Sequence, residues 1–474
     1  MSRSMSLSAL EQSVAFVKAW LPARFASAEL PGMAVAVSHR GSLLLNEAYG
    51  WADVEHAVPL TPAHQFRVAS HSKTFTATAV MLLVEEGRLR LDDPVAQHVP
   101  WLLGHRDRRW QHVTLRQLLS HGAGVIRDGR DTDYWQLERA FPDRERFQAE
   151  MEDTDLVVEN NTRLKYSNYG YTLLGLVIEA VAGQPYNQFV MERIVQPLGL
   201  LDTAPDYGPG MNLATGYTRR ESQRRQPLPH VSTHAMSPAT GFCSTAADLA
   251  CYFTAHMVGS GELLSDESKK EMQRTAWTAK TPGTPERTDY GLGMVLQPTE
   301  ERRLFGHSGG FPGFVTLSAA DPDSGLVVVA LTNADGPAAS MVTGIYSAIT
   351  YFQKHASAAP PTQDARRWAG HYANLWGEVL LAAVGDGMVA ANPGSWDPLA
   401  APQVLEFVDG DTLRIVETSG FGSEGELVRW EAGDGRMPTL RYAGSTLWPI
   451  GAWRERTRPS QGASGVSRPP DGDR

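Results

Sequence analysis

A serine and a lysine stand three residues apart in the stretch Phe66-Arg67-Val68-Ala69-Ser70-His71-Ser72-Lys73-Thr74-Phe75. Apolar residues then recur at helical spacing up to Gly87, which predicts a helix that begins near Ser70. The backbone dipoles at a helix start favour negative charge on a serine oxygen, and a lysine one turn later lies on the same face. This arrangement is one way to activate a serine hydroxyl, which alone attacks carbonyls weakly. Without further context, the pair would more often be an N-cap serine and a solvated lysine.

The composition predicts a soluble globular protein with more than one domain. The chain has 474 residues, 42% of them hydrophobic and 20% charged, which exceeds one ordinary core. Its 53 acidic and 43 basic residues give a net charge of −10, so we expect neither nucleic acid nor a membrane as a partner. Cys243 and Cys251 predict no disulfide framework. The first residues lack the pattern of a signal peptide and no apolar run could span a bilayer, so a cytoplasmic location is expected.

The order of the predicted elements indicates one antiparallel sheet assembled from both ends of the first domain. Strands are predicted at residues 33–38 and 43–49 and again at 314–319 and 326–331. Helices are predicted at residues 169–182, after Thr245 and at 338–354. We therefore expect an α/β (α+β) fold, in which helices flank the sheet and a helical block is inserted between its first and last strands.

Composition also divides the chain into segments. The first domain is expected at residues 1–355, and residues 356–365, rich in Ala, Ser and Pro, are predicted to be a linker. Residues 366–455 contain short apolar runs between turn dipeptides, which predict a small antiparallel β domain such as a lipocalin-like barrel. Residues 456–474 are polar and rich in Gly and Pro, so a disordered tail is expected there.

A second cluster, Tyr166-Ser167-Asn168, directly precedes the helix predicted at residue 169. A neighbouring lysine ammonium would lower the pKa of the Tyr166 phenol. Tyr166 and Lys73 could then pass the proton of Ser70 to a leaving group. The side chain of Asn168 offers a carbonyl to Lys73 and an amide to a substrate carbonyl.

A third cluster, Gly306-His307-Ser308-Gly309-Gly310, lies in a predicted strand. Its glycines leave room for a ligand to lie close to the backbone, so Gly309 is a candidate substrate-binding residue. The backbone N–H groups of Gly310 and Ser70 would form a two-donor oxyanion hole. The imidazole of His307 could bond to the lysine and tyrosine or to a substrate group.

The same segment matches G-x-S-x-G, the nucleophile elbow of α/β-hydrolases, which would make Ser308 the nucleophile. That elbow needs a helix directly after the serine, but Phe311-Pro312-Gly313 leads into a strand pattern. The elbow also needs a later acid and histidine, and the only later histidines are His355 and His371. The sequence therefore favours Ser70.

In this order, the three clusters resemble the serine β-lactamase and penicillin-binding-protein superfamily, and specifically its class C-like and D-aminopeptidase-like branch. The SxxK element is Ser70–Lys73, the YxN element is Tyr166–Asn168 and the KTG equivalent is His307-Ser308-Gly309. Residues 113–123 (VTLRQLLSHGA), 238–249 (PATGFCSTAADL) and 290–294 (YGLGM) are also similar. The resemblance covers residues 10–355 and implies a site between the sheet and the helical block.

One departure from the family pattern bears on the substrate. This chain has His307 where β-lactamases and carboxypeptidases usually have a lysine that helps to bind a substrate carboxylate. Loss of a permanent cation weakens the case for penicillin-like or free C-terminal carboxylate substrates. The histidine form resembles D-aminopeptidases and related peptidases and esterases of the branch.

We therefore expect a serine hydrolase that cleaves amide or peptide bonds of a small molecule or short peptide through an acyl-enzyme on Ser70. A carboxylesterase is the alternative, and a β-lactamase or a catalytically silent binding protein is less favoured. Ser70, Lys73 and Tyr166 are the expected catalytic residues. No metal-ligand or nucleotide-binding spacing is persuasive, so no metal or cofactor is expected. A homo-oligomer stays open, as does whether the arginine-rich residues 219–234 border the cleft or form a solvated connection.

Overall fold

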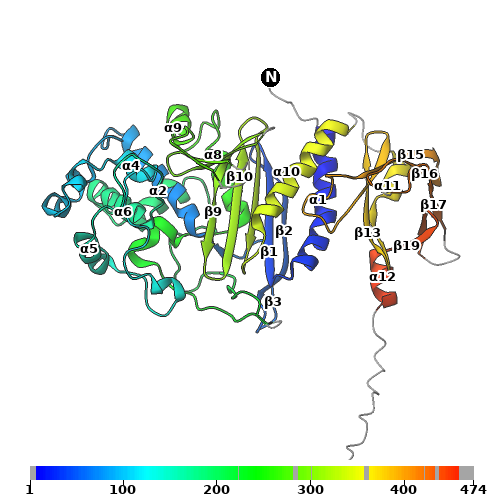
Figure 1. Cartoon of the computed structure of the whole chain (residues 1–474), viewed down its shortest axis with the longest axis horizontal. Coiled ribbons are helices and arrows are strands. Elements are labelled where there is room, and N and C mark those ends of the chain that lie inside the picture. Colours follow the sequence, from blue (N-terminus) through cyan, green and yellow to red (C-terminus); the bar gives the residue numbers. More distant parts are fainter. Residues whose placement is uncertain are drawn as a thin grey trace, which may run out of the picture. The chain divides into compact units, whose positions relative to one another are not determined.

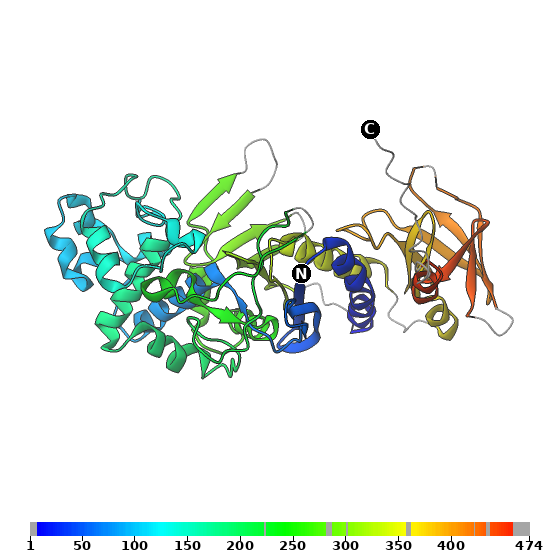
Figure 2. The ribbon, with the colours of Figure 1, turned by 90° about the horizontal axis from the view of Figure 1, so that it is seen from below.

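The computed structural model describes residues 7–221, 224–280, 287–299, 302–356, 362–420, 422–432 and 437–457. The chain forms two compact units (Figures 1 and 2). The first contains Phe25–Tyr346, and the second combines Ser6–Arg24 with Ser347–Arg474. Two helices, α1 (Leu7–Ala28) and α10 (Ala338–His355), contribute residues to both units. No helix in these described ranges is long and apolar enough to cross a membrane.

The first unit is built on an antiparallel sheet of nine strands in the order β3-β2-β1-β11-β10-β9-β8-β7-β6. The strands are β1 (Gly32–His39), β2 (Ser42–Asp53), β3 (Val58–Pro59), β6 (Trp277–Lys280), β7 (Arg287–Tyr290), β8 (Val295–Pro298), β9 (Arg303–Phe311), β10 (Phe314–Asp321) and β11 (Leu326–Thr332). Strand β1 pairs with β11, almost three hundred residues later. The expected sheet, assembled from both ends of the domain, is confirmed.

A helical block gathers beside the sheet and contains the long helices α2 (Ser72–Glu85) and α6 (Asn168–Ala182), which contact each other. The other helices of this unit are α3 (Val95–His98), α4 (Leu115–Leu119), α5 (Arg144–Glu152), α7 (Tyr186–Val190), α8 (Ala246–Ala255) and α9 (Asp266–Met272). The Ser167 side chain accepts from the Gly170 N–H at the start of α6, and Gly183 ends this helix in the left-handed region. These local caps therefore fix the residue at which α6 begins, directly after Tyr166 and Ser167.

The second unit contains a closed antiparallel barrel, which confirms the predicted β domain. Its elements are α11 (Gln363–Trp368), β12 (Gly370–Asn374), β13 (Gly377–Val384), β14 (Gly387–Ala391), β15 (Gln403–Asp409), β16 (Thr412–Glu417), β17 (Leu427–Glu431), β18 (Thr439–Tyr442), β19 (Ser445–Pro449) and α12 (Ile450–Thr457). Buried side chains such as Trp368, Leu405 and Leu440 fill its core. Part of the predicted linker, residues 357–361, and most of the predicted tail, residues 458–474, lie outside the described residues.

Two buried histidines predict that acid destabilises the fold. Burial lowers the pKa of both His71 and His256 to about 4. Their rings donate through Nδ1 to the carbonyls of Val68 and Tyr252, respectively, over 2.9 Å. An unfolded chain has histidines near pKa 6.5, so between pH 6.5 and 4 it binds more protons than the folded protein. The contribution of these histidines to the free energy of unfolding is therefore fully present above pH 6.5. It falls as the pH approaches 4, by up to about 3 kcal/mol for each histidine.

Urea unfolding at pH 7.5 and 5 measures this effect. The free energy of unfolding should fall on acidification, and the fall should be smaller in His256→Gln than in the wild type. The exposed His355 provides the control, because His355→Gln should keep the wild-type pH dependence. An equal free energy of unfolding at both pH values would contradict the prediction.

Candidate active site

Ser70 lies in a single tight turn, Ala69–His71, that leads directly into helix α2. The preceding Ala69 is fully buried and has φ of 47°, a left-handed conformation that costs energy in a residue other than glycine. The surroundings hold this turn, because the Ser72 hydroxyl donates to the Ala69 carbonyl over 2.6 Å and the Val68 N–H donates to the Phe242 carbonyl over 2.9 Å. The backbone thus presents Ser70 at the helix start, where the first N–H groups have no partner within the helix.

Lys73 is fully buried, and its Nζ lies 3.2 Å from Ser70 Oγ. The Nζ also donates to the Ala239 carbonyl over 2.7 Å. Burial holds the pKa of Lys73 well below its usual value, with the positive charge of Arg127 acting in the same direction and the negative charge of Asp128 opposing. A lysine that readily becomes neutral beside a serine oxygen can accept the proton of that serine.

Tyr166 completes the group around the nucleophile. The Ser70 hydroxyl lies near enough to the Tyr166 phenol to lower the pKa of that phenol, and the Tyr166 ring centroid lies 4.8 Å from Lys73 Nζ. Burial of the hydroxyl raises the pKa of Tyr166 above its usual value, although the bond to Ser70 and the charge of Arg127 oppose this. The expectation that the lysine lowers the pKa of the phenol is therefore wrong. Burial thus disfavours the charged form of both groups, the phenolate of Tyr166 and the ammonium of Lys73.

Asn168 begins α6 and is 4% exposed. Its Nδ2 donates to Asp128 Oδ1 over 2.5 Å, and its buried Oδ1 has no hydrogen-bond partner. The predicted contact of Asn168 with Lys73 is not among the hydrogen bonds of the described residues. The structure thus leaves Asn168 with an unused acceptor two residues after Tyr166.

Strand β9 brings Gly309 and Gly310 to this site. Strand β8 pairs with β9 only as far as Gly306, so residues 307–311 have one edge that β8 does not cover. Strands β9 and β10 are joined by a two-residue turn, so Phe311 and Phe314 form a hydrogen-bonded pair. Along an antiparallel strand, successive residues direct their backbone N–H groups to opposite edges, so the N–H of Gly310 points to the open edge of β9. A Cβ on Gly309 would lie 2.2 Å from the Val68 carbonyl oxygen, which shows how closely β9 approaches the turn of Ser70.

His307 lies behind the site, with 2% of its surface exposed. Its Nδ1 donates to the Ser308 carbonyl over 2.6 Å, so its Nε2 can accept from the Tyr290 hydroxyl over 3.2 Å. Burial holds the pKa of His307 well below its usual range, and the charges of His71 and Lys73 add to this effect. Burial therefore favours the neutral form of the imidazole at this position.

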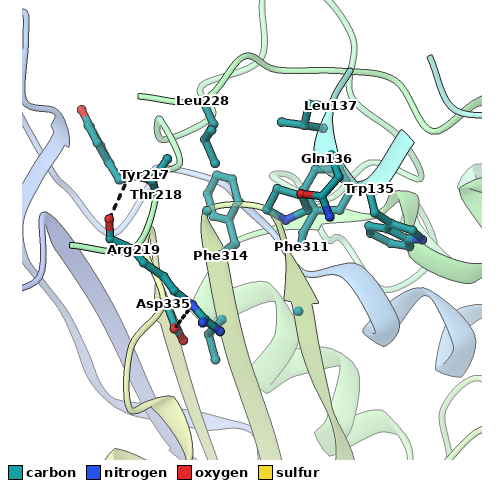
Figure 3. Close-up of a pocket in the computed structure, with 14 residues that line it drawn as sticks. Trp135, Gln136, Leu137, Tyr217, Thr218, Arg219, Leu228, Phe311, Phe314 and Asp335 are labelled. Carbon is teal, nitrogen blue, oxygen red and sulfur yellow. Dashed lines mark hydrogen bonds and ion pairs between the residues drawn. The ribbon is translucent and has the colours of Figure 1, made fainter. Parts of the chain in front are cut away.

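An open groove of about 530 Å³ begins at Gly310 (Figure 3). Its apolar wall includes Trp135, Phe311 and Phe314, and the Trp135 and Phe311 rings contact each other edge to face at 5.7 Å. Arg219 lines the same groove and pairs with Asp335 over 3.0 Å. The arginine-rich segment predicted from the sequence therefore contributes at least this residue to the groove.

Sequence reasoning missed several neighbours of the three motifs. Tyr290 and Ala239 belong to stretches that look familial, but neither received a role. Arg127 and Asp128 form a charged pair soon after the stretch VTLRQLLSHGA, which was their only signal. The rival nucleophile Ser308 lies in the middle of β9, which turns into another strand and not into a helix. The described part of the chain holds no group of three or more His, Cys, Asp or Glu residues placed to bind a metal.

Comparison with known proteins agrees with this geometry. The Beta-lactamase family model matches residues 17–349. Protein flp of Staphylococcus aureus is 27% identical over 310 residues, which are 64% of this chain and 60% of flp. The chain thus matches less than two thirds of the length of that relative.

Two solved structures share the fold. The octameric penicillin-binding protein homologue from Pyrococcus abyssi has a TM-score of 0.62 and 23% identity, covering 92% of this chain and 99% of the homologue. The D-amino acid amidase from Ochrobactrum anthropi, in complex with L-phenylalanine amide, has a TM-score of 0.60 and 24% identity, covering 72% and 98%. With the family match over most of its length, this chain belongs to the Beta-lactamase family.

Proposed function

We propose that this protein hydrolyses amide bonds of small molecules or short peptides through an acyl-enzyme on Ser70. The observation that carries the proposal is the presence of two proton-transferring groups beside one serine. Lys73 Nζ lies 3.2 Å from Ser70 Oγ, and the Ser70 hydroxyl lies near enough to the Tyr166 phenol to lower the pKa of that phenol, so a base and an acid flank one nucleophile. Burial favours the neutral form of both groups, in which Lys73 can accept a proton and Tyr166 can donate one.

In the proposed reaction, Lys73 takes the proton of Ser70 while Ser70 Oγ bonds to the substrate carbonyl carbon. The N–H groups of Ser70 and Gly310 hold the oxygen that becomes negative. Tyr166 then donates its proton to the leaving nitrogen as the carbon–nitrogen bond breaks, and the ammonium of Lys73 returns a proton to Tyr166. In the second half, water attacks the ester on Ser70 while Lys73 accepts a proton from that water. Lys73 then gives this proton to Ser70 Oγ as the bond between Oγ and the carbonyl carbon breaks, which frees the acid product and restores the enzyme.

Substrate binding in this proposal uses the open edge of β9 and the free acceptor of Asn168. An extended amide could pair with the backbone of Ser308 and Gly310, as an added strand does. Asn168 Oδ1 would accept a hydrogen bond from a substrate N–H. The remainder of the substrate would lie along the apolar wall of the groove at Trp135. An amide is favoured over an ester because an amine leaves poorly without a proton, and Tyr166 can supply one. The resemblance in fold to a D-amino acid amidase points to the same class of bond.

A fluorophosphonate probe tests the nucleophile. Peptide mapping should place its adduct on Ser70, and Ser70→Ala should not be labelled. Ser308→Ala should be labelled like the wild type, because Ser308 contacts neither Lys73 nor Tyr166 among the described residues. An adduct on any other serine overturns the proposal.

Turnover of matched anilides and esters of the same acyl group then decides the class of bond. Anilide hydrolysis that depends on Ser70 supports an amidase. Ester hydrolysis without anilide hydrolysis would make the protein a carboxylesterase with the same nucleophile.

A further inference from the structure

We propose that Arg127 binds a carboxylate of the substrate and so supplies, from another wall of the site, the permanent cation that is missing at His307. The inference rests on the proposed function at Ser70 and adds a substrate class to it. Its basis is the position of one guanidinium beside the reacting group.

Arg127 lies over the ring of the residue that is proposed to protonate the leaving group. Its Cζ is 5.2 Å from the centroid of the Tyr166 ring, and its side chain is 63% exposed. Its Nε donates to Asp128 Oδ2 over 3.1 Å. Among the described residues, its two terminal nitrogens donate no hydrogen bond. This leaves the outer side of the guanidinium open, which is the geometry that receives both oxygens of a carboxylate.

The backbone of Arg127 is fixed to the catalytic segment. Its carbonyl accepts from the N–H of Asn168 over 2.8 Å and from that of Tyr169 over 3.1 Å, so the loop is held on the first turn of α6. Asp128 then joins the two sides, because one carboxylate oxygen binds the Arg127 guanidinium and the other binds the Asn168 amide. A substrate held by Arg127 would therefore keep a defined distance from Tyr166 and Ser70.

Charge in the site favours an anion at this position. Lys73 and Arg127 are the two lysine or arginine side chains over the Tyr166 ring in the described part of the chain, and the imidazole of His121 also packs on this ring at 4.2 Å, where burial lowers its pKa. Lys73 is fully buried and faces Ser70, and the buried His307 is neutral. Lys165 is also near, but it makes no contact with this ring in that part of the chain. Arg127 is thus an exposed permanent charge beside Tyr166, and Asp128 engages only one side of it.

The carboxylate belongs either to the acyl part or to the leaving group, since Arg127 lies over the ring of Tyr166, and Tyr166 is proposed to act where these two parts separate. Three chromogenic esters separate these sources. They are 4-nitrophenyl butyrate, 4-nitrophenyl hydrogen glutarate with a carboxylate on the acyl part, and 3-carboxy-4-nitrophenyl butyrate with one on the leaving group. The measured quantity is kcat/KM of each carboxylate ester divided by that of the neutral ester.

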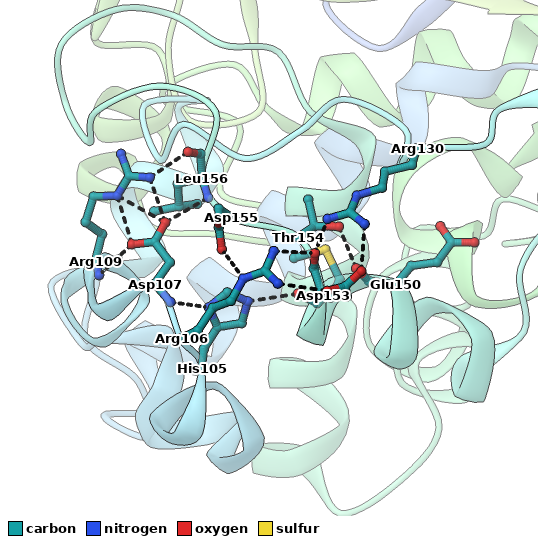
Figure 4. A network of polar contacts seen from close by, with 11 residues as sticks. His105, Arg106, Asp107, Arg109, Arg130, Glu150, Asp153, Thr154, Asp155 and Leu156 are labelled. Atoms are coloured by element: carbon teal, nitrogen blue, oxygen red, sulfur yellow. Dashed lines mark hydrogen bonds and ion pairs between the residues drawn. The ribbon is translucent and has the colours of Figure 1, made fainter.

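In Arg127→Gln this ratio should fall by about 10- to 100-fold for one of the two carboxylate esters, the range expected for a lost charge-assisted hydrogen bond. The loss should be mainly in KM, and Arg127→Lys should restore part of it. Arg130 provides the matched control, because it lies on the same loop with a similar exposed fraction but binds Asp153 (Figure 4). Arg130→Gln should keep the wild-type ratio for both esters.

A fall for the glutarate ester places the carboxylate on the acyl part, and a fall for the carboxynitrophenyl ester places it on the leaving group. Equal ratios in the wild type and Arg127→Gln for both esters overturn the inference. That result is distinct from failure of the proposed function, in which 4-nitrophenyl butyrate would be hydrolysed equally by the wild type and Ser70→Ala.

Discussion

Lys73→Met should lower kcat/KM for a neutral ester by about 10³-fold or more, at the upper part of the range for loss of a general base. The methionine side chain has nearly the volume of the lysine it replaces and suits a fully buried position. It removes the nitrogen that lies 3.2 Å from Ser70 Oγ, so the hydroxyl loses its base. The Ala239 carbonyl loses its 2.7 Å bond to the Nζ, which costs some stability but leaves the packing in place.

Lys269 offers a control for the loss of a buried lysine as such. It is also fully buried, and its Nζ donates to Ser260 Oγ over 2.6 Å in a different part of the first unit. Lys269→Met should therefore reduce stability while keeping catalysis within about threefold of the wild type, because it touches no residue around Ser70. Equal losses of activity in the two variants, or near-wild-type turnover in Lys73→Met, would remove Lys73 from the mechanism.

The pH dependence of the wild type gives the same assignment an independent test. Lys73 must be neutral to accept a proton. The value of kcat/KM therefore reaches its maximum above the pKa of Lys73 and falls about tenfold for each pH unit below that pKa. Because burial places that pKa well below the usual value for lysine, activity should persist at pH values where an ordinary lysine is fully charged. The pKa of Tyr166 is raised, so no alkaline loss from this phenol is expected below about pH 10.

Local signals in the sequence were sufficient to predict most elements that carry the site. The spacing of apolar residues predicted α6, and the strand pattern after Phe311-Pro312-Gly313 predicted β10. These signals work because the periodicity of apolar residues reports which face of an element is buried. The pairing of β1 with β11 has no local signal in the sequence. It could be predicted only from the order of the strands and helices along the chain.

Protonation states could not be predicted in the same way. The pKa of Lys73 and that of Tyr166 depend on how far each group is removed from water, and this burial is produced by segments from distant parts of the chain. For the same reason, the sequence could not indicate that Asn168 bonds to Asp128 or that His307 bonds to Tyr290. Residue types identified the participants, and only the packing identified their partners.

Gly309→Ala should reduce both stability and activity, and its neighbour supplies the matched comparison. A Cβ at position 309 would lie 2.2 Å from the Val68 carbonyl oxygen and 2.5 Å from Thr316 Oγ1, so β9 must move away from the turn of Ser70. Overpacking of this kind costs about 1–3 kcal/mol. A displacement near 1 Å between the Ser70 and Gly310 N–H groups would cost about 10²-fold in kcat.

Gly310→Ala meets no atom within 4 Å, and alanine in a strand loses less backbone entropy on folding than glycine does. Its melting temperature should therefore equal or slightly exceed that of the wild type, whereas that of Gly309→Ala should fall by several degrees. Gly309 has an ordinary negative φ, so any loss at that position comes from the steric contact and not from backbone strain. Scanning calorimetry of the two variants, with kcat for a neutral ester, measures both effects. A Gly309→Ala protein with wild-type melting and turnover would mean that β9 does not lie against the turn that holds Ser70, and the oxyanion hole could not form as proposed.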